Sequence, residues 1–373
     1  MKILHLVPLH IPASGIVQQA IAEQRAADET DIDWDVRLFT DIDLPEAAES
    51  LRIWAHPHKK STQRSSFWLR YVADKIEHRR RLYKWIGEHH LEYDVILLRY
   101  TTSDLSRART LSTISTPVVS MHHTLEIPEL KLIPGYQRYL QVAMEALVGP
   151  RNLRAASAIA GVTEEIVDYE LARTGANRPT LTFPNGINLD QQPVAADHRG
   201  NVPEILFVAS KFVEWHGLDL VLEDMSRSDE EFTLHLVGEV EPADLERASH
   251  DPRVKIHGRL TKEEIGDLIA RSWVGLSSFA LERKSMREAC TLKVREYLAA
   301  GLPTYSGHRD RFPADAPYYR QGPANIRNIL DYARSMRTHT RSDIRQQSAP
   351  LLSKANIIVS THDLLAKMPA RSS

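Results

Sequence analysis

EACTLKVREYLAAGLP, the stretch from Glu288 to Pro303, combines a short loop, a helical run and a helix stop. The run Lys293–Ala300 is rich in helix-forming residues. Gly301 and Pro303 predict its end, because glycine suits the position after a helix and proline cannot continue one. A loop that leads into a helix presents free backbone N–H groups and the positive end of the helix dipole. The stretch therefore predicts an anion-binding helix N-terminus.

Two carboxylates flank this predicted anion site. Glu288 lies in the loop, and Glu296 lies about one turn inside the helix, far enough along to reach past a phosphate to a sugar hydroxyl. Lys293, near the first turn, is placed to neutralise a bound charge. The alternative is that both glutamates are solvated helix carboxylates, since two glutamates at this spacing are common by chance.

The composition predicts a globular chain of two domains. Its 373 residues are too many for one typical core, and the contents of 42% hydrophobic and 26% charged residues are ordinary. The net charge of −2 gives no overall field that favours nucleic acid. The single cysteine, Cys290, excludes an internal disulfide. The N-terminal apolar run is broken by His5 and Pro8, so a first strand fits it better than a leader peptide.

Strands and helices alternate along both halves, which predicts an α/β fold with two parallel, doubly wound sheets. Two such halves place a cleft between them, with ligands at the carboxyl ends of the strands. The turn-rich segment around Pro184 divides residues 1–183 from residues 184–342, and a last helix covers about 343–373. The expected strands are Ile3–Val7, Asp35–Phe39, Asp94–Arg99, Pro117–Met121, Ala158–Val162, Glu204–Ala209, Phe232–Val237, Val254–His257 and Trp273–Ser277.

The loop and helix resemble the E-x7-E motif of the retaining family-4 glycosyltransferases, which have the GT-B fold of two Rossmann-like domains facing a central cleft. The residues that match in register are Glu288, Glu296, Ala299, Gly301 and Pro303, and Leu292, Lys293 and Tyr297 match one branch more closely. The usual Gly-Phe-Gly is replaced by Ala289-Cys290-Thr291. The resemblance implies that Glu296 binds a ribose. It also implies that Glu288 and the amides of Thr291 and Leu292 meet the sugar and diphosphate.

Other donor landmarks depart further from the family pattern. Phe183-Pro184-Asn185-Gly186-Ile187-Asn188 resembles the Pro-Asn-Gly signature that opens the second domain. The family's diphosphate-binding Arg and Lys are absent. Ser210 stands near the Arg position with Lys211 one residue later, and His216 replaces the Lys. We expect Lys211 to supply charge and His216 a hydrogen bond. Gly258 and Arg259 end a strand where the family contacts the base, largely through backbone.

In the first domain the resemblance points to two histidines and a glycine turn. His122 and His123 end a strand, and family members often carry a histidine here that contacts the transferred sugar. We favour His123, and a structural histidine at a strand end is the alternative. Ser14 and Gly15 stand at the usual Gly-Gly turn on the acceptor side. Because no carboxylate or cysteine stands at a familiar ligand spacing from the histidines, we expect no metal and no cofactor.

The segment Lys59–His90 is strongly basic and carries interleaved aromatic residues. Such a helix can rest on an anionic membrane or meet a lipid diphosphate, and the alternative is a solvated helix with an apolar core face. No nucleic-acid motif accompanies it.

Together these patterns indicate a retaining, metal-independent glycosyltransferase. It would move a sugar from a nucleotide-diphosphate donor, bound by the second domain, to a glycan or lipid-linked acceptor, bound by the first. Family analogy suggests bacterial surface polysaccharide synthesis in the cytoplasm, with peripheral attachment to the inner face of the membrane, and a last helix that crosses back to the first domain. The alternatives are a nucleotide-sugar epimerase of the same fold and a non-catalytic two-lobed binding protein.

Overall fold

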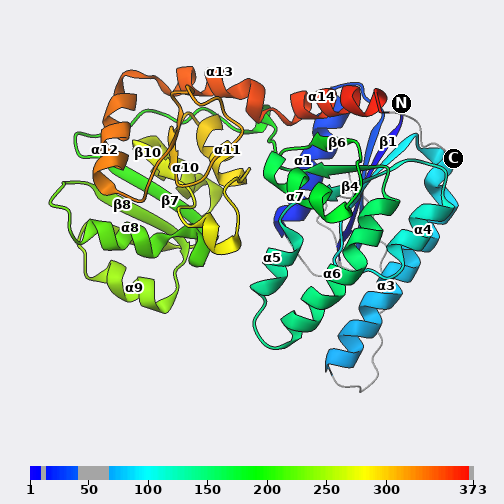
Figure 1. Cartoon of the computed structure of the whole chain (residues 1–373). Coiled ribbons are helices and arrows are strands. Elements are labelled where there is room, and N and C mark those ends of the chain that lie inside the picture. The colour runs from blue at the N-terminus through cyan, green and yellow to red at the C-terminus, as the bar shows by residue number, and fades with distance from the viewer. Residues whose placement is uncertain (10–13, 41–66, 369–373) are drawn as a thin grey trace. The chain divides into compact units, whose positions relative to one another are not determined.

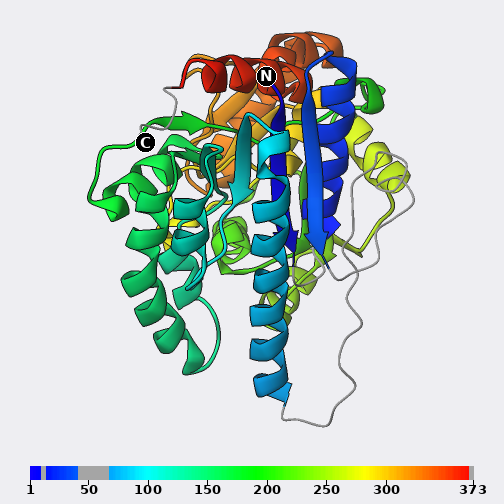
Figure 2. The same cartoon turned by 90° about the vertical axis from the view of Figure 1, so that its right-hand side faces the viewer.

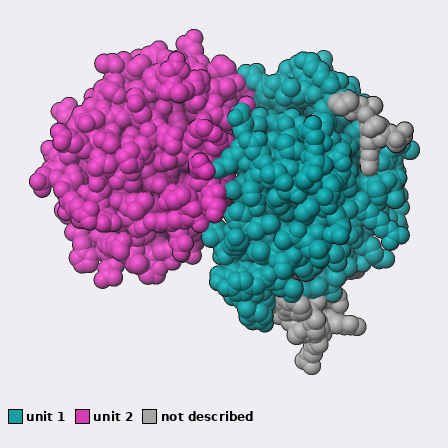
Figure 3. All heavy atoms as spheres, viewed as in Figure 1, with its two compact units in different colours: residues 1–184, 354–373 teal, residues 185–353 magenta. Residues whose placement is uncertain are grey.

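The computed structural model describes residues 1–9, 14–40 and 67–368, which form two compact units (Figures 1 and 3). Unit 1 comprises residues 1–184 and 354–373, and unit 2 comprises residues 185–353. Each unit has a sheet of six parallel strands with helices between successive strands.

The unit 1 sheet has the strand order β2-β1-β3-β4-β5-β6. Its strands are β1 (Ile3–Leu9), β2 (Trp34–Thr40), β3 (Val95–Arg99), β4 (Val118–His122), β5 (Ala158–Gly161) and β6 (Thr180–Thr182). The order reverses between β1 and β3, and ligands of such sheets bind outside the carboxyl ends of the strands at the reversal. The helices are α1 (Ser14–Glu29), α3 (Phe67–His89), α4 (Arg107–Thr113), α5 (Glu126–Lys131), α6 (Gln137–Ala155), α7 (Glu164–Thr174) and α14 (Lys354–Ala366).

Alternation along β1 buries its side chains on both faces of the sheet. Leu4 and Leu6 join a core cluster with Leu82 and Ile86 of α3. His5 points to the other face, where its Nδ1 lies 2.7 Å from Glu23 Oε1 of α1. Parallel sheets need this cover on both faces, so β1 is apolar almost throughout.

The last helix of unit 1 is fixed by a buried ion pair. α14 packs against α1, and Lys354 Nζ lies 3.2 Å from Glu23 Oε2 (Figure 1). Glu23 Oε1 also accepts a 2.9 Å hydrogen bond from Trp34 Nε1. Although burial opposes ionisation, these partners and His5 hold the pKa of Glu23 at about 2. The carboxylate therefore stays charged and ties α14 to β1 and β2.

The unit 2 sheet has the order β12-β11-β10-β7-β8-β9. Its strands are β7 (Glu204–Lys211), β8 (Thr233–Glu239), β9 (Val254–Gly258), β10 (Val274–Leu276), β11 (Thr304–Ser306) and β12 (Tyr319–Gln321). The helices are α8 (Leu218–Met225), α9 (Pro242–Ser249), α10 (Lys262–Arg271), α11 (Leu292–Ala299), α12 (Ile326–Ser335) and α13 (Arg341–Leu352). Here the order reverses between β7 and β10.

The predicted α/β fold with two parallel sheets is confirmed. The helix expected at about 343–373 is two helices instead, α13 and α14, which belong to different units. Ser353 between them has an extended backbone and pairs with Ile187. Strands β6, β11 and β12, each three residues long, were not predicted.

Helix α11 ends as its sequence predicts. The N–H of Leu302 donates to the carbonyl of Tyr297, and the N–H of Gly301 donates to that of Leu298, the two bonds of a Schellman motif. Gly301 has φ +80°, and a Cβ on it would lie 2.3 Å from the carbonyl oxygen of Arg341. The position therefore needs glycine for both its conformation and its space.

Gly301→Ala should lower the free energy of unfolding by more than ~2 kcal/mol, because left-handed strain of ~1 kcal/mol adds to a backbone clash. Gly175→Ala is the matched control. Gly175 has φ +61° after α7, but a Cβ there meets no atom within 4 Å. The control should lose only the strain, ~1 kcal/mol. Equal losses in urea denaturation would show that the contact with Arg341 does not matter.

Candidate functional site

The amino end of α11 carries two buried polar atoms that lack partners in the described parts of the chain, Thr291 Oγ1 and Lys293 Nζ. The Thr291 side chain does not cap the helix. Lys293 Nζ lies 5.5 Å from the centre of the Phe207 ring, and burial lowers the pKa of this amine to about 8. A buried ammonium without a hydrogen-bond partner beside a helix N-terminus is suited to bind an anion.

His216 lies close to this helix end. Its Nδ1 accepts a 3.0 Å hydrogen bond from the N–H of Val213, which leaves the ring proton on Nε2. Burial and the charge of Lys293 lower the pKa of His216 to about 3. Its ring packs edge-on against Phe207, which Lys293 also contacts. His216 is therefore a neutral Nε2–H donor beside a cation.

Two contacts fix the loop before α11. Asn185 Nδ2 donates a 2.7 Å hydrogen bond to the carbonyl of Cys290. The buried carboxylate of Glu288 accepts a hydrogen bond from Arg309, and the two backbones pair as a β-bridge. The predicted Pro-Asn-Gly turn thus holds the loop directly. The pairing of Arg309 with Glu288 could not be predicted from their sequence spacing.

Glu296 lies one turn after Lys293 on the same helix, and its side chain is exposed at the surface. Partial burial raises the pKa of Glu296, while Lys262 and Lys293 act in the opposite direction. The helix thus presents, in order, unpartnered N-terminal groups, a cation and a carboxylate, which matches the chemistry of a diphosphate followed by a sugar diol.

Ser210 and Lys211 end β7 as exposed residues, and Lys211 is paired. Its Nζ lies 2.8 Å from Glu241 Oε1 and 3.7 Å from Glu239 Oε1, and both carboxylates raise the pKa of Lys211. No hydrogen bond or ion pair between described residues joins Lys211 to His216 or Lys293. The residue expected to supply charge is therefore paired with one carboxylate at the end of β8 and another just after it.

The predicted base-contact residues lie at the end of β9. Gly258 has φ +67°, and Arg259 is exposed, with Nη2 3.6 Å from Glu239 Oε2. Both residues are accessible at the carboxyl edge of the unit 2 sheet, where β7 and β8 also end.

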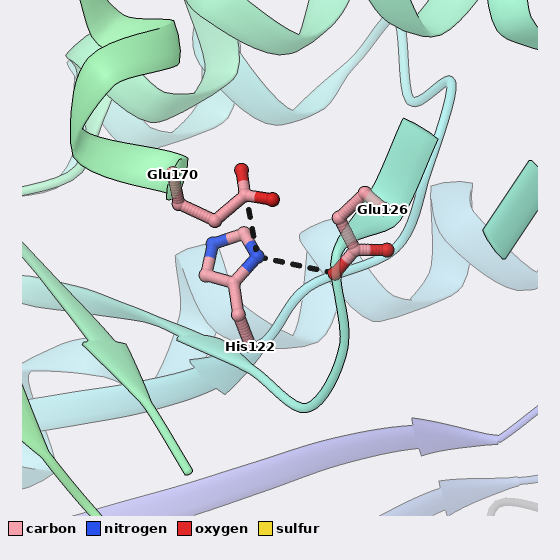
Figure 4. Close-up of side chains that lie close together, drawn as sticks. All are labelled: His122, Glu126 and Glu170. Carbon is pink, nitrogen blue, oxygen red and sulfur yellow. Dashed lines mark hydrogen bonds and ion pairs between the residues drawn. The ribbon is translucent and has the colours of Figure 1, made fainter. Parts of the chain in front are cut away.

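In unit 1, His122 is fully buried between two glutamates (Figure 4). Its Nδ1 lies 3.1 Å from Glu126 Oε1 and 3.8 Å from Glu170 Oε2, and its Nε2 lies 3.0 Å from Ser120 Oγ. Burial lowers the pKa of His122 to about 4 and raises that of Glu126 to about 8. Sequence spacing did not reveal these two carboxylates, which come from α5 and α7.

This cluster has the donor set of a metal site, since one ligand atom from each of the three residues lies within 4.8 Å of the others. Arg173, however, already pairs with Glu170 at 2.6 Å and with Glu145. Its charge supplies what a cation would otherwise bring. Protonation of Glu126 removes a second negative charge, so the cluster is stable as a hydrogen-bonded network.

His123 faces a different environment and lines a cavity of about 460 Å³ in unit 1. The cavity lies at the carboxyl ends of β1, β3 and β4, the point where the strand order reverses. Its charged lining residues are Lys75, Arg79, Arg99, Glu126 and Glu129. Burial and nearby Arg99 lower the pKa of His123, so its ring is neutral. Of the two histidines, only His123 reaches this cavity.

Ser14 and Gly15 begin α1 rather than form a loop before it. A Cβ on Gly15 would meet nothing within 4 Å, and its φ is not positive. Gly15 is therefore not required to form a tight turn, and the rest of the predicted loop lies outside the described residues.

In the basic segment Lys59–His90, only some of the described basic side chains are exposed to solvent. Lys59 to Ser66 lie outside the described residues. In the described part of α3, Arg79 donates to the carbonyls of Thr102 and Ser103 at 2.6 and 2.9 Å. Lys75 lines the cavity, and Trp85 is buried in the core. Two of the charges expected to face a membrane thus turn inward, whereas the side chains of Arg80 and Lys84 are each 76% exposed. No described helix is long and apolar enough to cross a membrane.

Comparison with known proteins agrees with this architecture. Residues 202–310 match the family model "Glycosyl transferases group 1". A glycosyltransferase from Rickettsia africae has a TM-score of 0.66 and 12% identity over 100% of this chain and 99% of its own. Anabaena HepE, solved with UDP, has a TM-score of 0.64 and 16% identity over 98% and 100%. The fold is GT-B.

A putative UDP-N-acetylglucosamine 2-epimerase from Listeria monocytogenes shares the fold less closely, with a TM-score of 0.55 and 14% identity over 100% of this chain and 98% of its own. No curated protein sequence matches the chain. The GT-B fold and the family match within unit 2 support a glycosyltransferase.

Glu126→Gln should make the protein more resistant to alkaline pH. In the folded protein the pKa of Glu126 is about 8, above the usual 4.5. The contribution of this carboxyl to stability is therefore complete below pH 4.5 and is lost as the pH rises through 8. Gln does not titrate, so the variant should gain more than ~1 kcal/mol relative to wild type between pH 6 and pH 9. Urea denaturation at both pH values measures this. Glu164→Gln, at an exposed position, should show no such gain. If Glu126→Gln lost as much stability as wild type between pH 6 and pH 9, the account would be wrong.

Proposed function

We propose that the protein is a retaining, metal-independent glycosyltransferase that moves a sugar from a nucleotide-diphosphate donor to a glycan or lipid-linked acceptor. The observation that carries the proposal is Lys293, a shielded ammonium with no partner among the described residues, at the amino end of α11. A diphosphate would supply the missing negative charge. The group 1 match over residues 202–310 includes this helix end.

In unit 2, the donor diphosphate would accept hydrogen bonds from the amides of Thr291 and Leu292, from Lys293 Nζ and from His216 Nε2. Glu296, one turn further along, would bind the ribose hydroxyls. Glu288, already oriented by Arg309, would contact the transferred sugar. Because HepE was solved with UDP, we propose a uridine diphosphate sugar as donor.

The reaction would break the bond between the anomeric carbon and the diphosphate oxygen and form a bond from that carbon to an acceptor hydroxyl. For retention, the acceptor would approach from the face that the diphosphate leaves, and a phosphate oxygen would take the hydroxyl proton. Lys293 and the dipole of α11 would stabilise the leaving charge. On this account neither a protein nucleophile nor a metal ion is needed.

We propose that the acceptor binds in the cavity of unit 1 that His123 lines. By family analogy, the enzyme would act in surface polysaccharide synthesis at the cytoplasmic face of a membrane. His123 Nε2 is buried without a hydrogen-bond partner in the described structure, so it is available to a sugar hydroxyl. Thr124 and Glu129 line the same cavity and offer further polar groups.

An epimerase of the same fold is the second candidate, since one shares this architecture. It would convert the donor without an acceptor, so product analysis on a nucleotide sugar alone separates the two activities. A non-catalytic binding protein would retain UDP and show no turnover with any acceptor.

Glu296→Ala should weaken UDP binding at least ~10-fold, because a ribose diol loses its acceptor. Isothermal titration calorimetry with UDP measures this. Glu263→Ala, an exposed carboxylate on α10, should bind UDP as wild type does. Unchanged affinity in Glu296→Ala would exclude the ribose role.

Lys293→Met should change binding and stability in opposite directions. UDP affinity should fall at least ~10-fold because the diphosphate loses its cation. The apo protein should unfold at higher urea concentration, because a buried amine of lowered pKa costs stability at neutral pH that Met does not. If both properties fall together, Lys293 is a structural residue and the diphosphate site is elsewhere.

A further inference from the structure

The turn from α5 to α6 and the exposed side of α6 carry large apolar side chains that no part of the described structure covers. Tyr136 is 82% exposed, Tyr139 66%, Leu140 59% and Leu147 65%. On a helix these positions recur at spacings of three, four and seven residues, so they share one side. At 1.5 Å per residue, the stripe from Tyr136 to Leu147 is about 16 Å long.

The exposed charges within the segment that carries the stripe are basic, whereas the exposed carboxylate of Glu129, just before it, lines the cavity. Between Leu130 and Leu147 the only carboxylate is Glu145. It is fully buried and bonded to Tyr100 and Arg173, so it does not reach the surface. Lys131 before the turn is exposed, and Arg138 donates to the Tyr139 hydroxyl at 3.0 Å. Aliphatic and tyrosine side chains with basic neighbours match the interfacial zone of an anionic membrane.

The stripe adjoins the cavity of unit 1. Leu130 and Ile133, at the end of α5 and in the turn, line that cavity. The turn and the start of α3 both lie at the end of unit 1 to which the strands of its sheet point (Figures 1 and 2). A molecule anchored in a lipid surface under the stripe would thus have its polar group beside Lys75, Arg99 and His123.

We propose that the α5–α6 stripe, formed by Tyr136, Tyr139, Leu140 and Leu147 with Lys131 and Arg138, docks unit 1 on an anionic lipid surface. The docked protein takes its acceptor from that surface as a lipid-linked molecule. The docking does not depend on the proposed function. The identification of the acceptor as a lipid-linked molecule does rest on the proposed function. This surface differs from the basic part of α3, whose Lys75 and Arg79 face inward.

Two neighbouring explanations fit the observations less well. A protein partner would need a surface complementary to the stripe in shape and hydrogen bonding, and the stripe offers few hydrogen-bonding groups. A membrane needs only apolar groups and positive charge. Self-association through the stripe would bring the basic residues of two copies together, which is unfavourable. The experiment nevertheless distinguishes contact between two copies of the chain from docking on a membrane.

The test is co-sedimentation of the full chain with vesicles of phosphatidylcholine, with and without phosphatidylglycerol. Wild type should bind the anionic vesicles. Tyr136→Ser/Tyr139→Ser/Leu140→Ser should lose about tenfold or more of that affinity because apolar area no longer enters the interface. Lys131→Gln/Arg138→Gln should lose only the preference for phosphatidylglycerol.

The matched control carries Ser at three exposed apolar positions of unit 2, Val202, Leu245 and Leu351, and should bind vesicles as wild type does. Circular dichroism and UDP calorimetry show whether each variant is folded. Equal vesicle binding by wild type and the stripe variant overturns the proposal. So does a dimer in sedimentation velocity that the stripe variant converts to monomer. If wild type binds vesicles but not UDP, the docking surface stands and the proposed donor fails.

Discussion

The buried ion pair between Arg295 and Asp310 is the interaction on which the candidate site depends. Arg295 Nη1 and Nη2 each lie 2.5 Å from an oxygen of Asp310, and both residues are almost completely buried. Lys293, two residues before Arg295, and Glu296, one residue after it, are the groups that we propose meet the ligand. The Tyr297 hydroxyl accepts a 2.9 Å hydrogen bond from the N–H of Val208, which fixes α11 to β7. With both contacts in place the helix cannot rotate, so Lys293 and Glu296 keep their directions.

Lys293 and Arg295, two residues apart on α11, differ in whether they have a partner. Arg295 has a bidentate partner, and the pair makes a rigid internal joint. Lys293 has no partner among the described residues and bears the cost of burial. A protein can retain a destabilising buried charge where a bound ligand would neutralise it. In the free protein the contacts of Arg295 and Tyr297 offset the destabilisation from Lys293. Arg295 thus holds the helix in place, and Lys293 is left for the diphosphate that we propose as its ligand.

Local patterns were enough to predict most of the fold. The periodicity of α10 and the glycine stop of α11 depend on neighbours in the chain, so they could be read directly. The three-residue strands could not, because little pattern fits into so short a segment. Arg309, which pairs with Glu288, and Glu170, which lies beside His122, come from distant elements. Lys211 meets carboxylates at and just after the end of the next strand. Sequence spacing does not reveal such encounters, so it identified residue types at the site better than their pairings.

The link between Lys354 and Glu23 has a consequence for how the chain is made. Glu23 leaves the ribosome early, but its cationic partner emerges only after the whole of unit 2. Until then unit 1 lacks both the lysine that pairs with a buried carboxylate and the helix that packs against α1. Closure over so long a sequence separation is slow. During synthesis, therefore, unit 1 cannot complete its helical cover until the whole of unit 2 has been made.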